Sequence, residues 1–293
     1  MENKPEVRDF LMSRRSRVTP EQAGLHAFGN RRVSGLRRSE VAALAGVSVE
    51  YYTRVERGNL RGVSDAVLDA IAMALQMDET ERAHLHDLAR AVNASPVRAR
   101  RRPAKPVVPA VVQRVVDGMP GLPAFVQNNR FDVLYANALG RALFSEMFED
   151  GSCRGNTVRF VFFSPAARRF YLEWERVART AVGSLRVEVG RNPNDTDLSN
   201  LIGELSTRSD AFRVMWGAND VGVFGDGTKG IRHPVVGELQ LDHSAMVLPG
   251  ATGLSMTVYS AAAGSATEDG LALLASWAAS SVSADSTVKG IDT

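Results

Sequence analysis

Arginine side chains gather in one short stretch of the sequence, and their chemistry is the first clue to a partner. A guanidinium group is always charged, and its fork of N–H donors matches two oxygens of a phosphate or the edge of a guanine. The stretch "LRRSEVAALAGVSVEYYTRVERG", residues 36–58, carries arginines at both ends of two short apolar patterns. Such arginines can be a solvated surface, but their clustering favours contact with a polyanion. The candidate phosphate contacts are Arg37, Arg38, Ser48, Arg57 and Arg61.

Two short helices must position these side chains. Apolar residues recur at helical spacing over residues 41–45, Gly46 interrupts them, and Ser48 offers an oxygen that can cap a second helix. Glycine at the corner permits the positive φ that a sharp turn requires. The pattern predicts a helix-turn-helix, whose second helix enters the major groove of DNA.

The second helix is predicted to have one buried face and one exposed face. Tyr52 and Val55 continue the apolar stripe, so we expect them in the core. Residues on the other face can reach the edges of the bases: arginine can donate to guanine, glutamate can accept from cytosine, and valine can pack on the methyl group of thymine. The candidate base contacts are Val49, Glu50, Thr53 and Arg54.

Further apolar stripes surround this pair of helices. They begin at Val7 upstream, after Ser64 downstream, and again near Leu85. About five helices in about 90 residues can bury a shared core. A helical bundle with a merely solvated basic surface is the alternative to a DNA-binding domain.

The charge distribution separates two parts of the chain. Residues 1–106 contain 19 Lys and Arg against 13 Asp and Glu, whereas residues 107–293 contain 16 against 20. The first part therefore suits a polyanionic partner and the second does not. With 293 residues, two domains are expected. We predict a DNA-binding domain at 1–92, a Pro- and Arg-rich basic linker at 93–106, a second domain at 107–280 and a disordered tail at 281–293.

The second domain has the pattern of an α+β fold. Residues 124–126 and 133–135 predict two strands around a polar turn, and helices are expected over 165–190 and 197–220. From Val221 the apolar period changes to two, which predicts an antiparallel meander, and a last helix is expected over 271–279. This order fits a PAS-like sheet.

Both parts resemble known families. "SEVAALAGVSVEYYTRVERG" resembles the helix-turn-helix of XRE-family regulators, although Arg37 replaces the Ser or Thr that usually caps the first helix. "NRFDVLYANALGRALF", "VRFVFFSPAARRFYLEWERVA", "LIGELSTRSDAFRVMW", "RHPVVGELQLDHSAMVLPG" and "MTVYSAAAGS" resemble the ligand-binding domain of MmyB-like transcription regulators. The resemblance implies a PAS-like sensory fold with a lipophilic pocket, for which fatty acids are the suggested ligands. The candidate pocket residues are Phe160, Phe162, Phe170, Trp174, Phe212 and Trp216.

Other chemical signals in the sequence are weaker. "GDGTKG" has the spacing of a dinucleotide-binding loop, but no helix pattern follows and Asp226-Gly227 is a hairpin signal. His233, Glu238 and His243 lie on strand sequence without the helical spacing of a metal site. Cys153 is the single cysteine, which excludes an internal disulfide and fits a reducing compartment. We therefore predict no metal and no cofactor.

The sequence as a whole predicts a cytoplasmic, homodimeric transcription regulator that binds a pseudo-palindromic duplex and senses a small lipophilic ligand. Neither a membrane-spanning segment nor a signal peptide is expected. Two alternatives remain: an enzyme domain tethered to DNA, and a toxin-antitoxin style binding module. Without paired carboxylates or a nucleophile beside a base, we predict that the protein is not an enzyme.

Overall fold

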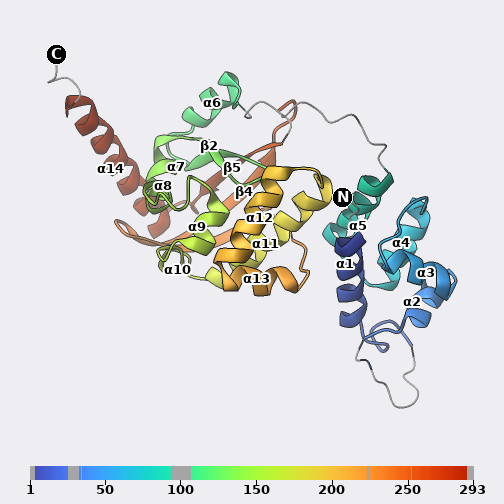
Figure 1. The fold of residues 1–293 in the computed structure, drawn as a ribbon. Helices are drawn as coiled ribbons and strands as arrows, with labels where there is room; N and C mark the ends of the chain where they lie inside the picture. The colour runs from blue at the N-terminus through green and yellow to red at the C-terminus, as the bar shows by residue number, and fades with distance from the viewer. Residues whose placement is uncertain are drawn as a thin grey trace. The chain divides into compact units, whose positions relative to one another are not determined.

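The computed structural model describes residues 4–25, 33, 35–93, 107–222, 225–251 and 253–288. These residues form two compact units (Figure 1). Unit 1 comprises Met1–Arg101, Val182–Ile202 and Arg213–Val223, and unit 2 comprises Arg102–Ala181, Gly203–Phe212 and Phe224–Thr293. The predicted basic linker, apart from Asn93, lies outside the described residues. Across the described part, no helix is long and apolar enough to cross a membrane.

The N-terminal part of unit 1 is a bundle of helices, as predicted (Figure 1). Its buried core joins residues from every helix, including Phe10, Val41, Tyr52, Ile71 and Leu88. Burial of these stripes provides the main stabilisation of such short helices. The helices are α1 (Lys4–Arg17), α2 (Arg38–Leu44), α3 (Val49–Glu56), α4 (Asp65–Ala74) and α5 (Glu79–Asn93).

The corner between α2 and α3 forms as the sequence predicts. Gly46 adopts a φ of +65°, and the Val47 N–H donates to the Ala42 carbonyl at 2.9 Å. The Ser48 hydroxyl accepts a hydrogen bond from the Tyr51 N–H at 3.0 Å and so caps α3. The helix-turn-helix geometry is therefore determined by local backbone chemistry.

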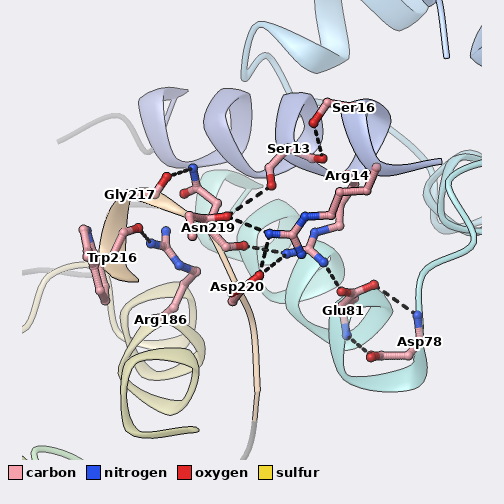
Figure 2. Close-up of polar contacts among 12 residues, drawn as sticks. Ser13, Arg14, Ser16, Asp78, Glu81, Arg186, Trp216, Gly217, Asn219 and Asp220 are labelled. Carbon is pink, nitrogen blue, oxygen red and sulfur yellow. Dashed lines mark hydrogen bonds and ion pairs between the residues drawn. The ribbon is translucent and has the colours of Figure 1, made fainter. Parts of the chain in front are cut away.

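Polar contacts join α1 to the other segments of unit 1 (Figure 2). Arg14 is 6% exposed, forms an ion pair with Glu81 of α5, and donates to the Asn219 carbonyl at 2.6 Å. Arg186 is 1% exposed, pairs with Glu6 at 2.5 Å, and its guanidinium lies 4.2 Å from the centre of the Trp216 ring. Such buried pairs are costly to break because they leave an uncompensated charge.

Unit 2 is built on a five-stranded antiparallel sheet in the order β2-β1-β5-β4-β3. The register aligns Val126 with Met256, Ser244 with Val258, and Ile231 with Leu239. The pair of strands followed by helices and then a meander confirms the predicted α+β class. The strands are β1 (Ala124–Asn128), β2 (Val133–Ala136), β3 (Gly227–His233), β4 (Gly237–Val247) and β5 (Leu254–Ser260).

The remaining helices occur before, between and after the strands. Helix α14 packs against α7 and β4. The sequence of α11 passes from unit 2 into unit 1 after Ala181. The helices are α6 (Ala110–Asp117), α7 (Ala138–Leu143), α8 (Ser145–Glu149), α9 (Thr157–Phe163), α10 (Ala167–Phe170), α11 (Trp174–Arg191), α12 (Thr196–Arg208), α13 (Asp210–Gly217) and α14 (Ala266–Val288).

The structure differs from the sequence interpretation at four elements. The helix expected over 197–220 divides at Ser209 into α12 and α13. The helix expected over 165–190 is interrupted, because Tyr171 bridges to Ile231 and the Leu172 N–H donates to the Gly230 carbonyl at 3.0 Å. Asp226-Gly227 leads into β3 and does not form a hairpin turn. The turn between β3 and β4 lies at residues 234–236. Helix α14 continues through residues 281–288. The sequence predicts a tail there, because the apolar pattern ends near Ala279.

Candidate nucleic-acid interface and ligand cavity

Helix α3 presents the predicted base contacts on its outer side. Val49, Glu50 and Arg54 are exposed and Thr53 is half-buried, whereas Tyr52 and Val55 are fully buried, as expected. We call Val49, Glu50, Thr53 and Arg54 the recognition face. They line an open groove together with Lys4, Arg57 and Asn59. The groove therefore offers cations, a carboxylate, a hydroxyl and an apolar side chain, which are the groups that contact DNA phosphates and base edges.

Arg54 is held by its neighbour on the same helix. Its guanidinium carbon lies 4.8 Å from the centre of the Tyr51 ring, within the range of a cation–π interaction. Arg54 is nevertheless exposed, and the ring contact restricts the orientation of its side chain. Less conformational entropy is then lost when the arginine binds a base.

Glu56, at the end of α3, is a buried anion whose role the sequence did not indicate. It is 1% exposed, accepts from the Arg15 Nε at 2.5 Å, and forms an ion pair with Arg38. The Tyr52 hydroxyl donates to it at 3.3 Å, and burial together with this carboxylate raises the pKa of Tyr52. Arg38, a predicted phosphate contact, thus already binds a carboxylate and is only 43% exposed.

The other predicted phosphate contacts occupy the borders of α2 and α3. Arg37 precedes α2, and its backbone N–H donates to the Glu40 carboxylate at 2.6 Å. This contact is the glutamate half of a capping box, whereas the side chain of Arg37 does not cap α2 as a Ser or Thr would and is exposed. Ser48 uses its hydroxyl as the cap of α3, and Arg57 and Arg61 are exposed. Their contact with phosphate stays a prediction.

Unit 2 contains a small, largely enclosed cavity between the sheet and its helices. Aliphatic side chains from α9 and α11 and aromatic side chains from the sheet form much of its wall. The volume of the cavity that the centre of a water molecule can occupy is about 20 Å³, so the cavity has room for roughly one water. The lining residues are Phe125, Gln127, Phe144, Thr157, Val158, Val161, Tyr171, Val177, Ala181, Lys229, His243, Ala245, Thr257 and Tyr259.

The strand side of the cavity is polar and positively charged. Lys229 is only 7% exposed, and its Nζ lies 5.7 Å from the centre of the Tyr259 ring. Burial, followed by the charge of Arg176, lowers the pKa of Lys229 to about 8. Burial, followed by the charge of Lys229, lowers the pKa of His243 to about 4. A negative charge in this cavity would therefore be stabilised.

The six aromatic residues predicted to form a pocket do not line this cavity. Phe160 and Phe170 form an edge-to-face pair in the core, and Phe162 packs on Phe212 at 5.1 Å between ring centres. The Trp174 indole N–H donates to the Val161 carbonyl at 2.9 Å. Trp216 belongs to unit 1 and contacts Arg186. Large apolar residues give the same sequence signal in a packed core as in a cavity wall.

Lys229 could have been found from the strand period. Lys229, Ile231 and His233 alternate along β3 and all three are buried, so a lysine occupies an inward-facing position. Lysine is rarely buried without a specific reason. The change of apolar period at Val221 predicts strands but does not indicate which face of each strand is buried, so it does not identify Lys229.

The weaker chemical signals have structural explanations. The His233 ring contacts the Ala142 carbonyl at 3.0 Å and accepts from the Val235 N–H at 3.2 Å. Cys153 is buried, and burial raises its pKa to about 11, so it is not activated as a nucleophile. Within the described ranges, no group of three His, Cys, Asp or Glu residues could hold a metal ion.

A helix-turn-helix with an exposed recognition face and a second domain with an enclosed cavity define a ligand-responsive, DNA-binding class of protein. Residues 108–274 match the model of the MmyB-like transcription regulator ligand binding domain, and residues 10–85 match a helix-turn-helix domain model. The chain therefore belongs to the family of MmyB-like transcription regulators, which confirms the predicted architecture. No curated protein gave a match.

Proposed function

We propose that this regulator binds a specific DNA sequence through α3 and changes its DNA affinity when a small lipophilic molecule, a fatty acid or acyl compound, enters the cavity of unit 2. The observation that carries the proposal is the enclosed, partly aliphatic cavity inside the region that matches a ligand-binding domain. The order of two strands, helices and a meander supports a PAS-like sensory domain over residues 107–280.

On the DNA side, Arg54 donates to guanine, Glu50 accepts from cytosine, and Val49 packs on a thymine methyl group. The flanking arginines bind phosphates and set the register of the helix. One recognition helix reads only about four base pairs, so useful specificity requires two copies on a pseudo-palindromic site. The protein therefore acts as a homodimer in the cytoplasm.

An acyl chain enters the cavity only if the walls move, since the free space holds about one water. The aliphatic walls contributed by Val158, Val161, Val177 and Ala181 are the side that can accept it. Each buried CH₂ group contributes about 0.8 kcal/mol, which offsets the cost of opening the walls. Affinity should therefore rise with chain length until the enlarged cavity is full.

The DNA-binding part is tested by selecting a duplex from a random library and measuring anisotropy over a range of salt concentrations. If about six phosphates are neutralised, log K should fall against log salt with a slope of roughly −5. Arg54→Ala should cost about 1 to 3 kcal/mol on the selected site and flatten discrimination at one base pair. The matched control, Arg61→Ala, should weaken all sequences equally and reduce the slope by about one. Equal losses of specific and random binding in Arg54→Ala would contradict the assignment.

The sensing part is tested by denaturing the purified full-length protein and identifying the released molecules by mass spectrometry. An acyl compound recovered unchanged, which also shifts DNA affinity when added back, supports a sensor. A molecule chemically altered by incubation with the protein would instead support an enzyme domain. Absence of any lipophilic ligand, with no effect of added fatty acids on DNA binding, would overturn the proposal.

A further inference from the structure

We propose that the cavity of unit 2 selects ligands with a carboxylate head group, which Lys229 binds at the strand side while an apolar tail extends toward α9 and α11. This inference rests on the proposed sensing function and adds the chemistry of the ligand. It differs from a purely lipophilic pocket, in which chain length alone would determine affinity.

The position of Lys229 is the first observation. It lies on β3, where it pairs with Leu241 of β4, and it lines the cavity although it is 7% exposed. The long stem of a lysine usually carries the ammonium group out to water. Here the fold instead keeps this side chain inside, against the ring of Tyr259. A buried ammonium in a cavity is a natural binding group for an anion.

Neutral polar groups from three further strands face the same space. Gln127 of β1, His243 of β4 and Thr257 of β5 all line the cavity. Among the described residues, the Gln127 Oε1 and the His243 Nδ1 are buried and have no hydrogen-bond partner. The amide of Gln127 can present its NH₂ after a flip. The neutral His243 ring already bonds the Gly227 backbone, so its Nδ1 can donate only if the proton moves from that bond. Lysine, amide and hydroxyl together can supply several donors to the two oxygens of a carboxylate.

The charges around Lys229 point in the same direction. Burial and the neighbouring Arg176 both disfavour its ammonium form, and Lys229 in turn disfavours protonation of His243. An anionic head group would oppose each of these effects through its charge, which an alcohol or ester lacks. The side chains that α9 and α11 contribute are mostly aliphatic, namely Val158, Val161, Val177 and Ala181, with Thr157 as the polar exception. The cavity is therefore amphipathic, with a positive end and an apolar end.

The test compares dodecanoic acid with dodecan-1-ol, which share a tail length, by calorimetry on the full-length protein at pH 7 below the micellar concentration. The wild type should bind the acid roughly 10- to 100-fold more tightly, because the alcohol can accept a hydrogen bond from the ammonium group but lacks the negative charge that forms an ion pair with it. Lys229→Met should remove this preference and leave binding of the alcohol nearly unchanged. Arg232→Met is the matched control: it removes a charge from the same strand, but from an exposed pair with Glu238, so the preference should persist.

Each outcome separates this inference from the proposed function. Equal affinity for acid and alcohol in the wild type would overturn the carboxylate inference and leave a lipophilic sensor. An equal loss of both ligands in Lys229→Met would also overturn it, since Lys229 would then only shape the cavity. If neither compound binds the wild type, both the inference and the sensing function fail.

Discussion

The buried lysine predicts a conflict between stability and binding that can be measured directly. In the unfolded chain the pKa of Lys229 is near 10.5, and in the folded protein burial lowers it to about 8. At pH 7 both states are protonated, so the folded state bears the full cost of the buried charge. A difference of 2.5 pKa units corresponds to about 3 kcal/mol. We therefore expect Lys229→Met to stabilise the ligand-free protein at pH 7 by up to that amount, because methionine fills similar space without a charge.

The sign of the pH dependence follows from proton linkage. Between pH 8 and about 10.5 the unfolded chain binds a proton that the folded protein has released, so the wild type gains stability as pH rises through this window. Lys229→Met should lack this gain, and the two proteins should converge at high pH. The pKa values of Tyr171 and Tyr259 are raised by burial, but both proteins carry these tyrosines. In the difference in unfolding free energy between the wild type and Lys229→Met, the contributions of these tyrosines cancel. Those of Arg176 and His243 cancel to first order, so the difference reports on Lys229.

The assay is urea unfolding of the full-length protein at several pH values, with Arg232→Met as the control. The control should lie within about 0.5 kcal/mol of the wild type, because its ion pair is exposed. Adding dodecanoate should narrow the difference in stability by about 1.4 to 2.7 kcal/mol, which is the free energy of the 10- to 100-fold tighter binding expected for the wild type. A Lys229→Met protein that is no more stable than the wild type at pH 7, with the same pH profile, would refute the reasoning.

Three further predictions concern unit 1, all measured by unfolding of the full-length protein. Glu56→Gln should lower the free energy of unfolding by about 2 to 4 kcal/mol, because the variant leaves buried donors without their anion. The control Glu50→Gln, at an exposed position, should change it little. Comparable values for the two variants would count against a structural role for Glu56. His84 has a pKa lowered to about 3 by burial, so stability present above pH 6.5 is lost as pH falls, by about 2 kcal/mol at pH 5, and His84→Leu should lack this loss. Glu6→Gln should lower stability by about 3 kcal/mol, since its partner Arg186 is buried; an unchanged midpoint would show that this pair does not form in solution.

The helix-turn-helix could be predicted because its determinants are local. Gly46 at the corner, Ser48 at the cap, and the stripe through Tyr52 and Val55 each act within a few residues, so the pattern and the geometry coincide. The α+β class followed from the change of apolar period. Burial of Glu56 depends on Arg15, which lies 41 residues away, and no local pattern contains that information.

The cavity could not be predicted for a related reason. A cavity is the space that side chains leave unfilled, and it depends on how α9 and α11 pack on the sheet. The aromatic residues chosen from the sequence, such as Phe160 and Phe170, fill the core, and the walls are made by smaller residues such as Val177 and Ala181. The family resemblance therefore indicated the domain that has a cavity, but large apolar residues in the sequence did not indicate its walls.

Helix α11 contributes residues both to the cavity of unit 2 and to a buried ion pair of unit 1. Val177 and Ala181 line the cavity, and further along the same helix Arg186 pairs with Glu6 of α1 inside unit 1. A ligand larger than the free space must displace part of the wall, which includes Val177 and Ala181. A ligand with equal affinity for both arrangements of the wall would shift nothing. A change in DNA affinity on ligand addition therefore requires that the ligand binds one arrangement of the chain more tightly than the other.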